Sequence, residues 1–161
     1  MATSYNIFED KELFEYLGRA VYESQRLEVN LAHIIRDIRI LKGKIRGRNL
    51  EESWQEARKV LSAKLEQTIG CLINELASLV PVDEGSKELL CQAKTKRNNS
   101  VHGFFLKHWI VAIAPTARDA MIHELKEAIE SISAAFKLSE NILNQLDARM
   151  KSDTDNVDET C

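Results

Sequence analysis

An arginine and a histidine separated by four residues are the side chains in this sequence best suited to chemistry at a phosphate. They are Arg97 and His102, and Asn98 follows the arginine directly. Histidine suits proton transfer because its pKa lies near neutrality. The planar guanidinium stays charged and can donate two hydrogen bonds to a phosphate. RNA carries its own nucleophile, the 2′-hydroxyl, so a protein with this pair could cleave RNA without a metal.

The spacing alone is not specific, because the pairs Arg118–His123 and Arg26–His33 are separated by four and six residues. The surroundings favour Arg97–His102, because basic residues, Lys94 and Lys96, come just before the arginine and a glycine, Gly103, comes immediately after the histidine. The alternative is purely structural. Gly103 would then be an ordinary helix stop, His102 a partner of the helix dipole and Arg97 a surface residue.

The segment from Lys94 to Phe105, KTKRNNSVHGFF, resembles the motif of the HEPN superfamily. In that motif a polar residue commonly follows an arginine, and four to six residues separate that arginine from a histidine. The resemblance implies a metal-independent endoribonuclease with no cofactor that leaves a 2′,3′-cyclic phosphate and a 5′-hydroxyl. It implies the catalytic residues Arg97, Asn98 and His102.

The resemblance also implies a homodimer whose active site draws on both protomers. Relatives of this kind commonly act as toxins or in antiviral defence, so it further implies an antitoxin or another neutralising protein as partner. The superfamily contains inactive members. The rival interpretation is therefore a non-catalytic helical module for dimerisation or partner binding.

Ideal helix geometry places Arg97 and His102 on different faces. Residues five apart lie about 140° from each other around an α-helix, so Arg97 and His102 should not share a face. Asn98 and His102 are four apart and should share one. We therefore expect Asn98 to orient His102, and Arg97 to reach round the helix or to serve a site completed by a second protomer.

The net charge of −3 argues against a generally polycationic binder of nucleic acid. Two basic groups stand out, at residues 36–48 and 94–97. They predict a footprint for the RNA backbone, and solvated helix faces are the alternative. The residues expected to contact RNA are Lys94, Lys96, Arg46 and Arg48.

The composition predicts an all-α protein. Two prolines and six glycines in 161 residues leave few breaks, and apolar residues recur at helical spacing. We expect helices at about 10–41, 50–79, 86–102 and 116–149, with Thr68 in the buried stripe of the second and a packed connection at 104–115. The prediction is an elongated bundle of four to five helices, with one domain at 1–150 and a disordered acidic tail at 151–161. The resemblance implies that this bundle is HEPN-like.

Several classes of protein are not indicated. The four histidines lack an HExxH or paired-cysteine context, so no metal site is predicted. The three cysteines form no CxxC motif and favour a reducing cytoplasm. The longest apolar run, residues 109–114, is too short to span a membrane. Trp54 and Trp109 are expected in the core.

Overall fold

The computed structural model describes residues 9–43, 50–108 and 115–158, and every regular element in these ranges is a helix. This confirms the all-helical class. The elements in chain order are α1 (Lys11–Leu41), α2 (Leu50–Leu65), α3 (Ile69–Leu79), α4 (Glu84–Asn98), the π-helix η2 (Asn99–Gly103), α5 (Phe104–His108) and α6 (Pro115–Asp158). Trp109 and the rest of 109–114 lie outside the described residues.

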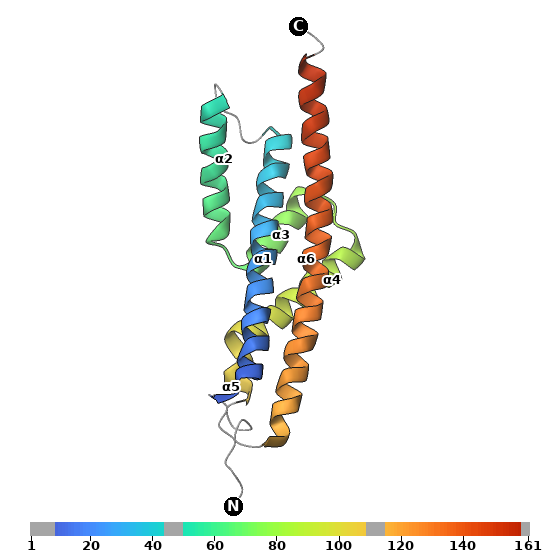
Figure 1. The fold of residues 1–161 in the computed structure, drawn as a ribbon. Coiled ribbons are helices and arrows are strands. Elements are labelled where there is room, and N and C mark those ends of the chain that lie inside the picture. The colour runs from blue at the N-terminus through green and yellow to red at the C-terminus, as the bar shows by residue number, and fades with distance from the viewer. Residues whose placement is uncertain (1–8, 44–49, 109–114, 159–161) are drawn as a thin grey trace, which may run out of the picture.

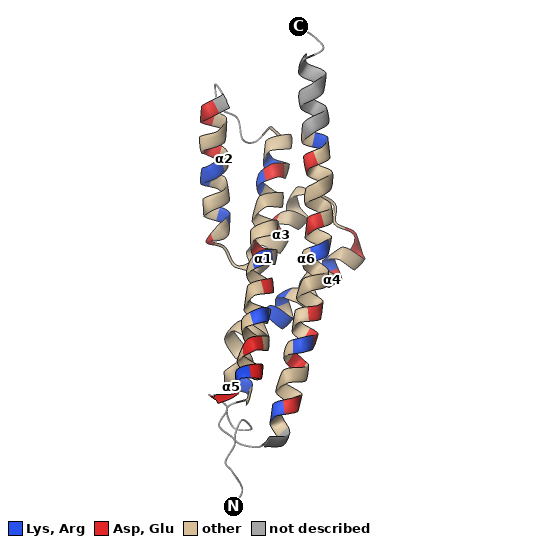
Figure 2. Ribbon diagram, viewed as in Figure 1, with Lys and Arg blue, Asp and Glu red and all other residues tan. Residues whose placement is uncertain are grey.

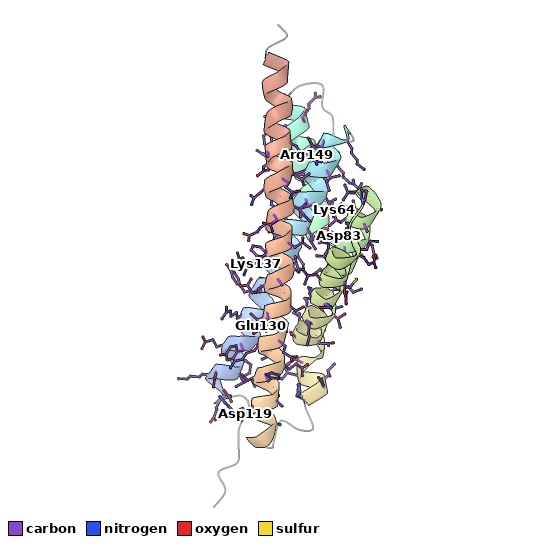
Figure 3. All side chains as sticks on the ribbon, turned by 90° about the vertical axis from the view of Figure 1, so that its right-hand side faces the viewer. Lys64, Asp83, Asp119, Glu130, Lys137 and Arg149 are labelled. Atoms are coloured by element: carbon purple, nitrogen blue, oxygen red, sulfur yellow. The ribbon has the colours of Figure 1, made fainter. Side chains whose placement is uncertain are left out.

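The long helices α1 and α6 run side by side in the same direction and form the shaft of an elongated bundle (Figure 1). Helix α2 returns along α1 at one edge, and α3 and α4 cross behind the pair. Asp83 marks the start of α4, which descends beside α6 towards α5 (Figure 3). Helix α5 and the start of α6 both lie at the end of the bundle where α1 begins (Figure 1).

The apolar stripe predicted for the first helix repeats every three or four residues from Leu13 to Leu41, with Ser24 as its one polar member, and it faces the core in α1. Leu13, Leu27 and Leu31 are fully covered, and they pack with apolar residues of α3, α4 and α6 or of α5 and α6. The polar member of the stripe, Ser24, is also buried, and its hydroxyl donates to the carbonyl of Ala20 at 2.7 Å. The hydroxyl is satisfied within its own helix, which explains why a serine is tolerated there.

The helix expected at 50–79 is two helices, so that prediction was wrong. Thr68 adopts an extended backbone conformation and its hydroxyl accepts from the amide of Cys71 at 3.4 Å, which makes it the N-cap of α3. The stripe predicted on α2 is consequently not buried throughout. Ala57 is covered, but Trp54 is 56% exposed and Leu65 is 50% exposed. Helix α2 lies at the edge of the bundle, where one neighbour cannot cover a whole face.

Replacing Thr68 by alanine should lower the free energy of unfolding by about 1 kcal/mol, because the first turn of α3 loses its cap. Urea unfolding followed by circular dichroism measures the change. Thr95→Ala is the matched control. Thr95 donates to the carbonyl of Cys91 within α4 at 3.0 Å, and alanine at such a position should cost nothing. Equal losses in both variants would contradict the capping role.

Two further boundaries differ from the sequence-based expectation. Asp83, not Ser86, caps α4, since its carboxylate accepts from the amide of Ser86 at 3.0 Å. Helix α6 continues to Asp158, through most of the tail predicted to be disordered, because residues 116–158 contain neither proline nor glycine to end it. Residues 159–161 lie outside the described part. Among the described residues, no helix has the length and apolar character needed to cross a bilayer.

Candidate functional site

The predicted motif lies where α4 widens into a π-helix. Helix α4 ends at Asn98, η2 occupies Asn99–Gly103, and α5 follows directly at Phe104, all with right-handed helical dihedral angles at the junctions. Gly103 therefore does not stop a helix. In the described residues the glycine with a positive φ is Gly43, after α1, at 64°. The expected end of the third helix near 102–103 was wrong because the chain absorbs one extra residue per turn instead of breaking.

The π turn brings Arg97 and His102 together. In a π-helix the backbone bonds join residues five apart, so side chains at that spacing lie on nearly the same face. The Nη1 of Arg97 is 2.9 Å from the Nε2 of His102. The 140° separation expected from an ideal α-helix does not apply here. Two side chains whose types suit phosphate chemistry thus touch within a single chain.

The contact determines which nitrogen of the neutral His102 imidazole carries the proton. A guanidinium has donors and no acceptor, so Nε2 of His102 must accept and the ring must carry its proton on Nδ1. Nε2 is the atom that a base would use. While Arg97 donates to it, however, that lone pair is occupied. The pair can act on a substrate only when the guanidinium moves or shares its donor.

Asn98 contacts the arginine. Its Oδ1 accepts from Nη1 of Arg97 at 3.1 Å. The expected hydrogen bond from Asn98 to His102 is replaced in this arrangement by a contact that steadies the guanidinium. Asn98 and His102 are both exposed, whereas the side chain of Arg97 is only 15% exposed.

Glu28 of α1 is the residue that sequence reasoning missed. Its Oε1 lies 2.8 Å from Nη2 of Arg97, and the Glu28 side chain is 22% exposed. No local pattern announces this contact, because Glu28 looks like any acidic residue on the flank of a long amphipathic helix. Only the packing of α1 against the end of α4 brings the carboxylate to the motif.

Contacts on both sides of the motif hold it on the bundle. Ser100, buried within η2, donates to the carbonyl of Lys96 at 2.9 Å. Beyond the turn, Phe104 is buried, and Glu124 of α6 accepts from Lys107 at 2.8 Å and from His108 at 2.9 Å. Burial alone would raise the pKa of Glu124, but these hydrogen bonds outweigh it and hold the pKa below its usual value.

Replacing Glu124 by glutamine should lower the Tm at pH 7 by a few degrees. A carboxyl whose pKa is depressed by folding stabilises the protein above its unfolded pKa, near 4.5, and loses that contribution as the pH falls through the lower folded value. The Tm difference between wild type and Glu124→Gln should therefore shrink below about pH 4.5. Thermal scans from pH 3 to pH 7 measure it, and a difference that grows on acidification would refute the assignment.

Only two of the four residues expected to bind the RNA backbone are among the described residues. Lys94 and Lys96 lie on α4 near the motif, but Lys96 pairs with Glu127 of α6 at 3.0 Å. Arg46 and Arg48 lie outside the described residues. Nearby in the same basic group, Arg36 pairs with the buried Asp37 at 2.6 Å. Figure 2 shows blue and red segments alternating along α1 and α6, so the described cations stand among acids.

The two other arginine–histidine spacings serve different contacts. Arg118 donates to Asp10 and Glu12 at the start of α1, and these bonds raise its pKa further. The guanidinium of Arg26 lies 3.9 Å from the centre of the Phe136 ring. His33 lines a hollow between α1 and α6. His123 lies beside Glu127.

Comparison with known proteins places this chain in no group. No family model, no curated protein and no solved structure matches it. Among the described residues no group of three or more histidine, cysteine or acidic side chains is arranged to hold a metal ion. The geometry of Arg97, His102, Asn98 and Glu28 is therefore the basis for a functional proposal.

Proposed function

We propose that this protein is a metal-independent endoribonuclease of the HEPN type, acting in the cytoplasm as a toxin or in defence. The observation that supports this best is the 2.9 Å contact between Arg97 and His102. It joins a neutral imidazole, able to accept a proton, to a cation able to bind a phosphate. The helical bundle and the RNNSVHG segment agree with a HEPN-like fold.

The reaction is an intramolecular displacement at phosphorus. Nε2 of His102 takes the proton of the 2′-hydroxyl, and the 2′-oxygen attacks the adjacent phosphorus. The bond from phosphorus to the 5′-oxygen breaks, leaving a 2′,3′-cyclic phosphate, and the departing oxygen takes a proton to become a 5′-hydroxyl. The guanidinium of Arg97 offsets the negative charge that builds up on the phosphoryl oxygens.

A second protomer would supply what one protomer lacks. His102 is exposed, and a single neutral imidazole provides a base but no acid for the departing oxygen. A two-fold axis beside η2 would add a second His102, and the second protomer would exclude water. This second imidazole could donate the proton if it were in its protonated form and its Nε2 were released from its own Arg97. Light scattering coupled to gel filtration tests the homodimer, and a strict monomer at assay concentration would contradict the composite site.

The nuclease is tested with an end-labelled RNA in excess EDTA. We expect cleavage to fragments that end in a 2′,3′-cyclic phosphate and begin with a 5′-hydroxyl. The matched control is the same sequence with 2′-O-methyl groups, which lacks the nucleophile and should remain intact. Cleavage of the methylated strand, or products with 5′-phosphates, would exclude the proposed chemistry.

The rival function is a non-catalytic partner-binding module, in which Arg97 is a structural cation. The observation in its favour is that the guanidinium is already ion-paired with Glu28. Exposed apolar side chains on α2, Trp54 and Leu65, would offer a contact surface. A pure protein that leaves RNA intact in both EDTA and Mg²⁺ would favour this module.

If the nuclease acts as a toxin, its host would also require an antitoxin to remain viable.

A further inference from the structure

Arg97 is surrounded by acceptors before any RNA arrives. Its Nη1 faces Asn98 and His102, and its Nη2 faces Glu28. A guanidinium binds a phosphate best when it offers two parallel donors in its plane. Nη1 already has two acceptors and the side chain is 15% exposed, so the donors left for a phosphate are Nε and Nη2, and Nη2 already lies 2.8 Å from Glu28.

Glu28 is the partner whose chemistry most resembles a phosphate. It is an oxyanion on the guanidinium, whereas Asn98 and His102 present neutral acceptors. Glu28 also comes from a different part of the chain, α1, so its contact can break without unwinding the π turn. A phosphate bound at Nη2 would take the place of the carboxylate and leave the charge of Arg97 compensated.

The ion pair is imperfect in a way that favours exchange. Oε1 of Glu28 lies close to Nη2, but this oxygen and Nε of Arg97 are both buried without a well-formed hydrogen bond to any described residue. Buried charges with unsatisfied hydrogen-bonding capacity make a weak pair, because desolvation offsets much of the attraction. A ligand that satisfies Nε as well as Nη2 would be bound in preference to the carboxylate.

We infer that Glu28 occupies the phosphate position on Arg97 in the RNA-free protein, and that RNA binds by displacing it. This inference rests on the proposed nuclease function and assigns a regulatory contact to the same site. Displacement draws the guanidinium towards the phosphate, which releases the lone pair of Nε2 on His102. The base is thus freed only when a phosphate is in place, so Glu28 keeps the site inactive without substrate.

The opposite role would be a positioning carboxylate that RNA never displaces. The two roles predict opposite signs. If Glu28 only positions Arg97, removing its charge should loosen the guanidinium and weaken RNA binding. If Glu28 competes with the phosphate, removing its charge should strengthen binding, and this gain should require Arg97.

Binding is measured by fluorescence anisotropy with a labelled 2′-O-methyl RNA, which keeps every phosphate but cannot be cleaved. We expect Glu28→Gln to lower the Kd roughly threefold to tenfold. Glu23→Gln is the matched control. It removes the same charge from the same helix, where Glu23 pairs with Arg26 at 3.2 Å, and should change the Kd by less than about twofold. In an Arg97→Ala background, Glu28→Gln should have no such effect.

An unchanged or raised Kd in Glu28→Gln, or a gain equal to that of Glu23→Gln, would overturn the exchange. Should Glu28→Gln fail to fold, as judged by circular dichroism, Glu28→Asp replaces it, because the shorter side chain weakens the contact while keeping the charge. It should also lower the Kd, by a smaller factor, and a raised or unchanged Kd would overturn the inference. The EDTA assay on unmodified RNA is separate, so loss of the nuclease and loss of the exchange give different results.

Discussion

Replacing His102 by alanine is expected to lower kcat/KM for RNA cleavage in EDTA by about 10²–10⁴-fold, the usual contribution of a positioned acid–base group. Arg97 would still attract the phosphate, but the imidazole that accepts the proton of the 2′-hydroxyl would be missing. The exposed imidazole contributes little to packing, so the thermal unfolding of the variant should match that of wild type. Initial rates at several RNA concentrations give kcat and KM separately.

His123→Ala is the matched control for this loss. His123 is exposed on α6 and pairs there with Glu127 at 3.3 Å, and it belongs to one of the two alternative arginine–histidine spacings. Its replacement should leave kcat/KM within about twofold of wild type. Equal rates in all three proteins would mean that the cleavage comes from a contaminant. A loss in His123→Ala alone would move the active site to α6.

The parts of the fold that repeat a simple period could be predicted from the sequence. The stripe on α1 follows steps of three and four residues from Leu13 to Leu41, and that face of the helix is the one that meets the core. Such a pattern is decisive because a helix with one apolar face has few ways to bury it. The apolar positions of α6 from Met121 to Leu146 follow the same logic. Met121, Leu125, Ile132 and Leu146 are buried, and Ile142 and Leu143 are partly buried against the core.

The parts that depend on a single competing interaction could not be predicted. Between α2 and α3 a threonine sits at a position that fits the apolar stripe, so the pattern alone runs through it. Whether Thr68 packs or caps depends on where the chain must turn to reach the rest of the bundle. The exposure of Trp54 has the same origin, since an apolar face is buried only if another element covers it.

At the candidate site, some features could be predicted from the sequence and others could not. The motif residues Arg97, Asn98 and His102 could be selected by type and spacing, and Arg97 contacts each of the other two. Their contact pattern could not be derived, because the sequence pattern indicates an ordinary α-helical turn at residues 97–102, whereas the chain forms a π turn there. Glu28 could not be found at all, since its role arises from tertiary packing between α1 and α4.

The largest effect on stability is expected from Leu31→Ala in the middle of α1. Leu31 is fully buried and belongs to the core that α1 shares with α3, α4 and α6. Truncation to alanine removes apolar burial and leaves a cavity that the surrounding helices close only in part, so the free energy of unfolding should fall by about 2–5 kcal/mol. In a protein of this size that loss corresponds to a Tm lower by roughly 4–20 °C.

The matched control is the same substitution at Leu106 of α5, where the side chain is 82% exposed. Its truncation should change the free energy of unfolding by less than about 0.5 kcal/mol. Urea unfolding at one fixed protein concentration measures both variants, because dimerisation would make the midpoint depend on concentration. Similar losses at the two positions would show that the α1 stripe does not lie in the core. The packing of α1 that places Glu28 beside Arg97 would then be wrong as well.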